Sequence, residues 1–528
     1  MEKKKLQVWM PLFLSIAMIA GIFIGYKMRD SMPGKSFFYM EKRRPVQEIL
    51  DLIERKYVDD VNITALADTA IEAMLSKLDP HSSFIPASEL DRVNEDIQGS
   101  FFGIGIEFDI YDDTLNVVNV LKDGPGFKAG VKTGDKFIEA NDIKIAGKMM
   151  KADSIRNILR GNRGSSVTVD ILRNSKIINL SITRDIIPVS SVDAAYMLNS
   201  ETGYLRLNKF STQTYREFML SLEALKKKGM TKMVLDLRGN GGGVLEEAVE
   251  IADEFLEGDK LITYTEGKHT PRKEFRCRRQ GQFEKGALVV LSDESSASAS
   301  EILMGALQDW DRATIIGRRS FGKGLVQEQF NLSDRSALRL TIARYYTPTG
   351  RSIQRSYANG GKAYYDEIGN RFLNRNDAVS DSIKLDTGKI YQSPSGKKLY
   401  GGGGITPDLY ITGDTGKLSE VIAKIYTKGL VNHFGYLYVL NNPSISAQYK
   451  DAGQFSGSFE IGATQWAFFE QIASRDSVNL SAITTDDRAF INKSMKAAIA
   501  RQVWRNDGYF EVYNATDSMV MKSLELLK

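Results

Sequence analysis

The sequence predicts a multidomain α/β protein with helical regions at both ends. Two observations indicate this fold class. Its 528 residues, 42% of them apolar and 26% charged, are enough for three or four globular domains and show no disordered or collagen-like bias. The hydrophobic pattern also changes along the chain, from helical spacing to short alternating strands, then to alternating strands and helices, and finally back to helical spacing.

Residues 1–30 are predicted to anchor the chain in a membrane. Leu6 to Tyr26 form a mostly apolar run behind three lysines, long enough to span a bilayer as a helix. Because no small-x-small cleavage site follows, we expect an uncleaved single-pass anchor rather than a removed signal peptide. The flanking charges orient it weakly, since Lys27 and Arg29 are also basic. We expect an inner-membrane anchor with the bulk of the chain on the periplasmic side, where a single cysteine is unexceptional.

Residues 40–97 are predicted to form a helical domain. Apolar side chains recur at helical spacing from Val46 to Tyr57 and from Ala70 to Leu78. Asp79-Pro80 ends the second run, and the stretch from Asp79 to Phe84 is interpreted as a turn. We assign His81 no chemistry.

Residues 98–184 change to short strands with glycine turns and one helix candidate, Ala152 to Leu159. Phe102-Gly-Ile-Gly105, the glycine-spaced stretch from Gly124 to Asp135, and Leu159-Arg-Gly161 together resemble a PDZ domain. The physical reading agrees, because the glycines free the backbone to cradle a terminal carboxylate and the adjoining strand edge can accept a peptide. The candidate tail-binding residues are Phe102, Gly103, Ile104, Gly105 and Arg160. For Arg160, a carboxylate partner and a solvated helix end both stay open.

Residues 185–410 alternate strands and helices, which predicts a layered sheet. The glycine-rich turn from Asp236 to Gly243 lacks the Gly-Lys-Ser/Thr ending of a P-loop and the spacing of a dinucleotide fingerprint, which argues against nucleotide binding. The basic run from Lys268 to Lys285 is interpreted as a solvated loop. A Cys277–His269 dyad is conceivable, but that same loop holds both residues. Residues 411–528 are predicted to be a helical domain without chemistry.

The balance of charges and the residue counts limit the classes of partner and cofactor. Seventy basic against 66 acidic residues leave a net charge of +4, and no DNA- or RNA-binding motif is present, so we expect no nucleic acid partner. One cysteine excludes an intramolecular disulfide framework and any multi-cysteine metal site, and the three histidines share no ligand spacing. We therefore expect neither a cofactor nor a metal.

The candidate nucleophile is Ser298, at the start of a predicted helix from Ile302 to Trp310. Free N–H groups and the positive end of the helix dipole there favour a developing anion. A capping box formed with Glu301 is the alternative interpretation. Lys323 lies between two glycines near apolar residues, where burial can leave a neutral amine that takes a proton from a serine, although a solvated loop lysine stays open. Gln327 follows four residues later and could orient that amine.

Ser298-Ala-Ser-Glu301, Phe321-Gly-Lys-Gly324 and Gln327 resemble the catalytic stretch of the C-terminal processing peptidases, or tail-specific proteases. The resemblance implies that Ser298 is the nucleophile, Lys323 the general base and Gln327 its orienting partner, in a crotonase-like layered α/β core. It also implies that the glycine-rich turn supplies Gly242 or Gly243 to an oxyanion hole, with the N–H of Ala299 as the second donor.

The function predicted is a membrane-anchored serine endopeptidase that cuts exported proteins near C-termini selected by its PDZ domain. Its partners would be protein or peptide substrates with free C-termini, and it could form a homo-oligomer. Two alternatives stay open. One is a catalytically silent PDZ adaptor, and the other is an esterase or acyl-transfer enzyme that uses the same dyad.

Overall fold

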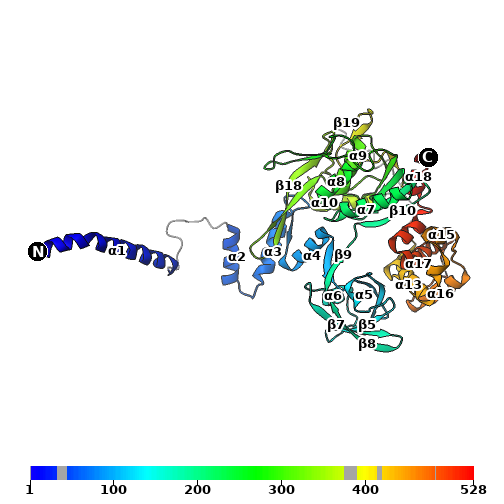
Figure 1. Cartoon of the computed structure of the whole chain (residues 1–528), viewed down its shortest axis with the longest axis horizontal. Coiled ribbons are helices and arrows are strands. Elements are labelled where there is room, and N and C mark those ends of the chain that lie inside the picture. The colour runs from blue at the N-terminus through cyan, green and yellow to red at the C-terminus, as the bar shows by residue number, and fades with distance from the viewer. Residues whose placement is uncertain (1, 32–44, 374–388, 413–418, 482) are drawn as a thin grey trace. The chain divides into compact units, whose positions relative to one another are not determined.

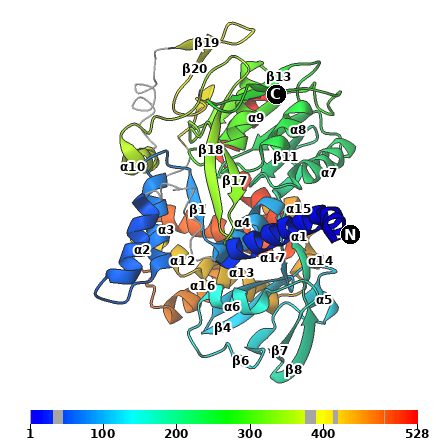
Figure 2. The same cartoon turned by 90° about the vertical axis from the view of Figure 1, so that its left-hand side faces the viewer.

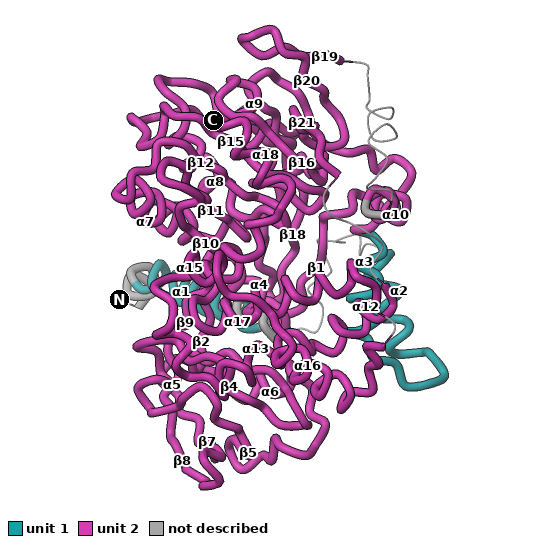
Figure 3. Tube along the Cα trace, turned by 90° about the vertical axis from the view of Figure 1, so that its right-hand side faces the viewer, with its two compact units in different colours: residues 1–74 teal, residues 75–528 magenta. Residues whose placement is uncertain are grey.

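The computed structural model shows a mixed α/β chain, as the sequence predicts (Figure 1). It describes residues 2–31, 45–373, 389–412, 419–481 and 483–528. The chain divides into two compact units, residues 1–74 and 75–528 (Figure 3). The first unit holds helices α1 (Glu2–Ser31), α2 (Pro45–Lys56) and most of α3 (Ile63–Leu75), which confirms the helical runs expected before Asp79.

The predicted membrane anchor is contradicted. Among the residues that the structure describes, no helix is both long and apolar enough to cross a bilayer. The prediction of a single-pass anchor over residues 1–30, and the inner-membrane location drawn from it, is therefore wrong.

A β-rich module with two short helices follows α4 (Ala87–Gln98). Its main sheet has the order β3-β4-β5-β7-β8, with β6 paired to β5, while β2 pairs separately with β9. Ile155 and Leu159 of α6, one helical turn apart, are buried in its core, and α6 has the bounds predicted. The elements are β2 (Ser100–Gly103), β3 (Ile106–Tyr111), β4 (Thr114–Val120), α5 (Pro125–Lys128), β5 (Lys136–Ala140), β6 (Ile143–Lys144), α6 (Ala152–Leu159), β7 (Ser166–Arg173), β8 (Lys176–Thr183) and β9 (Asp185–Pro188).

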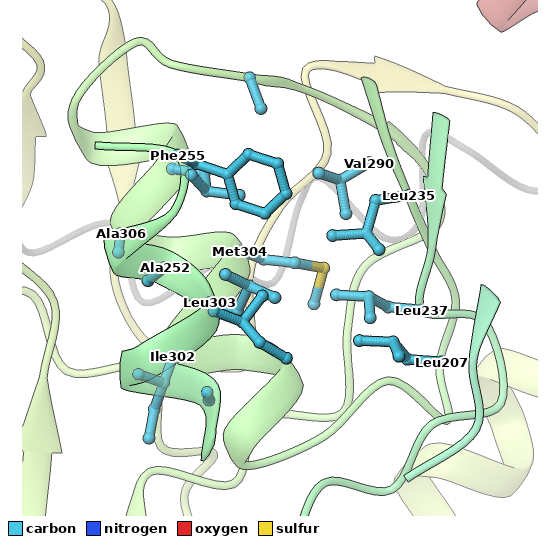
Figure 4. Close-up of a cluster of buried hydrophobic side chains, with 14 of the residues drawn as sticks. Leu207, Leu235, Leu237, Ala252, Phe255, Val290, Ile302, Leu303, Met304 and Ala306 are labelled. Atoms are coloured by element: carbon cyan, nitrogen blue, oxygen red, sulfur yellow. The ribbon is translucent and has the colours of Figure 1, made fainter. Parts of the chain in front are cut away.

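The core sheet has the order β10-β11-β12-β15-β16-β21, parallel except for β10. Alternate strand residues face opposite layers: Leu235 packs with α7, α8 and α9, and Val234 packs with α18. In Figure 4, Leu303 and Met304 of α9 share a cluster with Leu235. The elements are β10 (Val192–Met197), β11 (Thr202–Leu207), α7 (Thr214–Lys227), β12 (Lys232–Asp236), α8 (Leu245–Asp253), β15 (Leu288–Ser292), α9 (Ala299–Asp309), β16 (Thr314–Gly317) and β21 (Leu409–Tyr410).

A second sheet of the order β1-β18-β13-β14, with β17 also paired to β18, lies in the same unit. β17 and β18 run antiparallel side by side (Figure 2). Because β1 pairs with β18, the turn from Asp79 to Phe84 joins this sheet. The elements are β1 (Ser83–Ile85), β13 (Leu261–Glu266), β14 (Lys273–Arg276), β17 (Leu325–Asn331), β18 (Ala337–Tyr346), α10 (Gly360–Leu373), and the pair β19 (Ile390–Gln392) and β20 (Lys398–Tyr400).

The basic run from Lys268 to Lys285 is more than a solvated loop. It contains β14, and Phe275 and Cys277 are buried in the core. Burial raises the pKa of the Cys277 thiol to about 12, with Asp253 adding to the effect, so this thiol is unsuited to nucleophilic chemistry. Among the described residues Arg279 binds Glu250 and Glu254, which explains part of the positive charge.

The C-terminal helices divide between two places. Helices α12 to α17 share one hydrophobic core, whereas Met519 and Val520 of α18 pack on the far face of the core sheet. Arg505, inside α17, has a non-helical backbone with φ 61° and ψ −147°, which kinks the helix. The elements are α12 (Glu420–Thr427), α13 (Leu430–Asn441), α14 (Ile445–Gln448), α15 (Ala452–Ser458), α16 (Ala463–Arg475), α17 (Thr485–Asn514) and α18 (Ser518–Leu526).

Candidate active site

Ser298 lies between β15 and α9 with an unusual backbone, φ 54° and ψ −113°. For a residue with a Cβ such a conformation costs about 1–3 kcal/mol and persists only where the surroundings impose it, often at functional sites. The Glu301 carboxylate accepts the N–H of Ser298 at 2.8 Å. The N–H of Glu301 donates to the carbonyl of Ser298, not to its hydroxyl. Ser298 and Glu301 thus have the capping-box arrangement, although the Ser298 hydroxyl makes no cap hydrogen bond with any described residue.

The neighbouring serines have structural partners. The Ser296 hydroxyl donates to the carbonyl of Leu237 at 2.8 Å, and the Ser300 hydroxyl donates to the carbonyl of Asn240 at 3.0 Å. In the described part of the chain, the Ser298 hydroxyl has no hydrogen-bond partner, and the residue is half-buried. Within the described residues, Ser298 thus differs from the two serines beside it in having a hydroxyl without a hydrogen-bond partner.

Glu301 joins the start of α9 to the segment before β17. Its fully buried carboxylate accepts the Ser320 hydroxyl at 2.6 Å, the Gly322 N–H at 2.7 Å and the Lys323 N–H at 2.9 Å, in addition to the Ser298 N–H. Burial raises its pKa to about 7, against these four hydrogen bonds. Sequence reasoning gave Glu301 only a capping role, whereas the structure shows that it holds both candidate catalytic segments.

Lys323 carries an amine that the fold leaves available. Burial lowers its pKa, the positive charge of Arg339 lowers it further, and the charges of Glu301 and Asp79 oppose the effect. Its Nζ makes no hydrogen bond or ion pair with any residue that the structure describes. The hydroxyl of Tyr345 lies 2.5 Å from the carbonyl oxygen of Lys323 and 3.1 Å from that of Ser298, which ties the two backbones together.

Gln327 lies on β17 and does not contact the amine of Lys323 through a hydrogen bond. Its Nε2 donates to the Thr341 hydroxyl on β18 at 3.3 Å. The Thr341 N–H donates to the Ser82 hydroxyl, which in turn donates to Asp79 at 2.6 Å. The strand therefore connects Gln327 to the Asp79 turn, and the four-residue spacing alone did not reveal this partner.

His81, to which the sequence assigned no chemistry, lies beside the candidate site. Its ring Nε2 is 2.9 Å from the Tyr364 hydroxyl, and the backbone N–H of His81 donates to the Asp79 carboxylate. Burial and then the charge of Lys323 lower the pKa of His81 to about 4, so the ring is neutral at ordinary pH. The signal in the sequence was the turn motif itself, because the electrostatic influence of Lys323 on His81 depends on the pairing of β1 with β18.

The glycine-rich turn lies against Ser298. A Cβ placed on Gly242 would be 2.8 Å from the Cβ of Ser298 and 2.9 Å from the nitrogen of Ala299. The Gly242 N–H donates to the side chain of Asn240 at 2.9 Å. Within the described residues, the N–H groups of Gly243 and Ala299 have no acceptor. Of the two glycines considered from the sequence, Gly243 is therefore the one with a free donor.

A buried ion-pair network holds the glycine-rich turn in place. Asp236 accepts Arg206 at 2.8 Å, Arg238 at 2.7 Å and the Tyr204 hydroxyl at 2.6 Å. Burial acts to raise the pKa of Asp236, but the two arginines hold it below its usual value. Arg238 also binds Asp517, just before α18, at 2.9 Å. The C-terminal helix thus fixes the turn that faces Ser298.

The predicted tail-binding residues line a groove between β3 and α6. A cavity of ≈ 400 Å³ there is lined by Gly103, Ile104, Gly105 and Arg160, but by Phe101 rather than Phe102. The Phe102 side chain is exposed on β2. β3 is an edge strand that pairs only with β4, so its outer edge is open to an added strand.

Arg160 already has partners inside the fold. Its Nη1 is 2.9 Å from Glu95 of α4, and its guanidinium lies over the Phe101 ring at 4.1 Å. The sequence left open whether Arg160 pairs with a carboxylate or is solvated. The structure shows it paired with a carboxylate of the same chain.

Three family models match separate parts of the chain. They are Peptidase family S41 over residues 201–360, PDZ domain over 103–183, and a family of unknown function over 421–506. The candidate residues Ser298 and Lys323 lie within the first match, and the glycines of the groove open the second.

Curated relatives and a solved structure show the same similarity. A carboxy-terminal-processing protease of Bartonella bacilliformis is 37% identical over 316 residues, 58% of this chain and 71% of the relative. A probable CtpA-like serine protease of Staphylococcus epidermidis is 32% identical over 59% of this chain and 63% of its own length. The structure of a photosystem II D1 C-terminal processing protease is 29% identical, with a TM-score of 0.34, over 58% of this chain and 89% of that one.

Proposed function

Because this chain belongs to the carboxy-terminal-processing proteases of peptidase family S41 and is a serine-type peptidase with an internal PDZ domain, we propose that Ser298 is its nucleophile and Lys323 its general base. In this proposal residues 98–184 are the PDZ domain and 185–410 the protease core, flanked by helical domains at 40–97 and 411–528. The observation that carries it is Glu301, whose buried carboxylate accepts the N–H groups of both Ser298 and Lys323, while the amine of Lys323 bonds to none of the residues that the structure describes.

The proposed reaction begins when the Ser298 oxygen attacks the carbonyl carbon of the scissile peptide bond and the neutral amine of Lys323 takes the hydroxyl proton. The carbonyl oxygen becomes an anion, which the N–H groups of Gly243 and Ala299 stabilise; each such donor typically contributes about 10²–10³ in rate. The carbon–nitrogen bond then breaks, and the Lys323 ammonium returns its proton to the leaving amine. Water, deprotonated by the same amine, releases the acyl group from Ser298.

Gln327 and the Asp79 turn act as positioning residues in this proposal. Since Gln327 binds Thr341 and Thr341 binds Ser82, these groups fix β17 and β18 beside Lys323. The negative charges of Glu301 and then Asp79 oppose the lowering of the Lys323 pKa by burial.

The PDZ groove is proposed to bind the free C-terminal tail of a protein substrate, which the enzyme then cleaves near that end. Three features support this role: the Gly103 to Gly105 turn, the open edge of β3 and the apolar floor that includes Ile104 and Leu159. A solved structure of a PDZ domain of a carboxy-terminal protease from Vibrio cholerae contains a bound peptide.

Ser298→Ala tests the central assignment. We expect kcat/KM for a fluorogenic peptide with a free C-terminus to fall about 10⁴-fold or more while the circular dichroism and melting temperature stay unchanged. A serine-directed acylating probe should modify Ser298 in the wild type and leave the neighbouring Ser296 and Ser300 unmodified. Activity close to wild type in the variant, or labelling of another serine, would contradict the assignment.

A further inference from the structure

The groove between β3 and α6 has a second wall that belongs to another part of the chain. Ala498, Arg501, Gln502 and Arg505, all on α17, line the same ≈ 400 Å³ cavity as the PDZ residues. The family model of the PDZ domain ends at residue 183, so this wall lies outside it.

Specific contacts hold α17 and its neighbour α13 against the PDZ domain. Arg505 forms an ion pair with Glu107 of β3. On α13, His433 stacks on Tyr111 of β3, with 3.8 Å between ring centroids and 8° between planes. One strand, β3, thus carries both contacts with the C-terminal helices and also the open edge proposed to receive the tail.

The kink of α17 lies at this contact. Arg505 has a φ of 61°, which costs a residue with a Cβ about 1–3 kcal/mol. Just beyond it, Asp507 accepts the N–H of Ala195 on β10 at 2.8 Å, so the kinked segment is also attached to the edge strand of the core sheet. A second cavity of ≈ 480 Å³ beside β10 is lined by the same Glu107, Arg501 and Arg505. The kink therefore positions two arginines where the two cavities meet.

A peptide added to β3 would present alternate side chains to the two walls of the groove. Ile106 and Phe108 pack toward the PDZ core, whereas Glu107 faces away from it and binds α17. If the side chain of the last peptide residue enters the apolar side near Leu159, the side chain of the residue before it points toward α17. The third residue before the end faces the same way.

The charge on that wall is positive. Arg505 forms an ion pair with Glu107. Arg501 is exposed and forms no ion pair with any other described residue. Gln502 adds a neutral amide donor between them along the helix. A carboxylate is the group that best matches an unpaired guanidinium, since charge-assisted bonds of this kind are the stronger ones.

We propose that α17 forms the second wall of the tail-binding groove, and that Arg501 and Arg505 select tails with an acidic side chain one or three residues before the terminal carboxylate. This inference rests on the proposed role of the PDZ groove as the site that binds the substrate tail. It adds a binding determinant from the C-terminal helical region, which also fixes the glycine-rich turn through the Asp517–Arg238 ion pair.

The test uses the full chain carrying Ser298→Ala, so that bound peptides are not cut. Two fluorescent peptides with free C-termini, identical except for Glu or Gln at the penultimate position, are titrated by fluorescence anisotropy. We expect the Glu peptide to bind about three- to tenfold more tightly, with the difference reduced by added salt. Arg501→Gln and Arg505→Gln should each lower this preference, whereas the matched control Arg488→Gln, on α17 but over Trp466, should keep it.

A charge reversal provides the second measurement. Arg501→Glu should make a peptide with a penultimate Lys bind more tightly than the Glu peptide. Because residue 501 is exposed, we expect this variant to fold normally, so misfolding would not account for the reversed preference. Equal affinities of the Glu and Gln peptides for the unsubstituted wall would overturn the inference while leaving tail binding intact. If neither free-ended peptide binds, or if amidated peptides bind equally well, tail recognition itself is wrong and the inference falls with it.

Discussion

Around Ser298 the supporting carboxylates are wholly buried, whereas along the PDZ groove the charged side chains remain partly in water. Glu301 and Asp236 are 0% exposed, but Glu107 and Arg505 keep 48% and 39% of their side-chain surface accessible. A buried group that loses a partner suffers the full cost of desolvation, while an exposed ion pair contributes about 0–1 kcal/mol. The candidate active site is thus suited to a fixed geometry, and the proposed tail-binding groove to graded differences in affinity.

Substituting the base should give the largest effect. Lys323→Arg keeps a positive charge in the same buried place but cannot supply a neutral amine, so kcat/KM should fall about 10⁴-fold. In the wild type, kcat/KM should rise with pH as Lys323 loses its proton, and because burial lowers its pKa the midpoint of that rise should lie below the usual value of about 10.4. Full activity of the arginine variant would mean that another group is the base.

Two adjacent glycines offer a matched pair for the oxyanion turn. A Cβ on Gly242 would lie 2.6 Å from the carbonyl oxygen of Ala297, at a φ of 93°, whereas a Cβ on Gly241 meets nothing within 4 Å. Gly242→Ala should therefore lower kcat about 100-fold by displacing the donors beside Ser298, and Gly241→Ala should leave it near wild type. Equal kcat values for the two variants on one peptide would show that the turn does not position the donors.

The same contrast explains how much the sequence could predict. Helix α6 and the strands around it followed from local periodicity, and Ser298, Lys323 and the glycines from short motifs. The roles of Glu301 and His81 did not follow, because each depends on packing between segments far apart in the chain. Glu301, at the start of α9, accepts the backbone N–H of Lys323, and the pairing of β1 with β18 brings His81 within the electrostatic influence of Lys323. The ion pair between Arg160 and Glu95 and the groove wall formed by α17 could not be predicted from any local sequence pattern.

A smaller effect is expected from the Asp79 turn, which lies at the edge of the buried network. Asp79→Asn removes a negative charge that raises the pKa of Lys323, so the pH at which kcat/KM reaches half its maximum should move down. The plateau rate should fall only severalfold, since the amide oxygen can still accept the backbone N–H groups of His81 and Ser82, although the Ser82 hydroxyl loses its carboxylate acceptor. The exposed Asp486→Asn, on α17, serves as the control. A profile that moves to higher pH would contradict the proposed influence of this charge.

The smallest effect is expected at Arg160, on the groove. Its guanidinium is already bound to Glu95 and lies over Phe101, and both members of the ion pair are partly exposed, so a tail carboxylate would have to compete for it. In Arg160→Ala the affinity for a free-ended peptide should therefore change about threefold or less, and the preference for a free over an amidated C-terminus should persist, because the backbone of Gly103 to Gly105 still cradles the carboxylate. The measurement compares both peptides with wild type and variant by anisotropy. A preference that disappears in the variant would show that Arg160 leaves Glu95 to bind the tail, and that this side of the groove selects through one side chain rather than through its backbone.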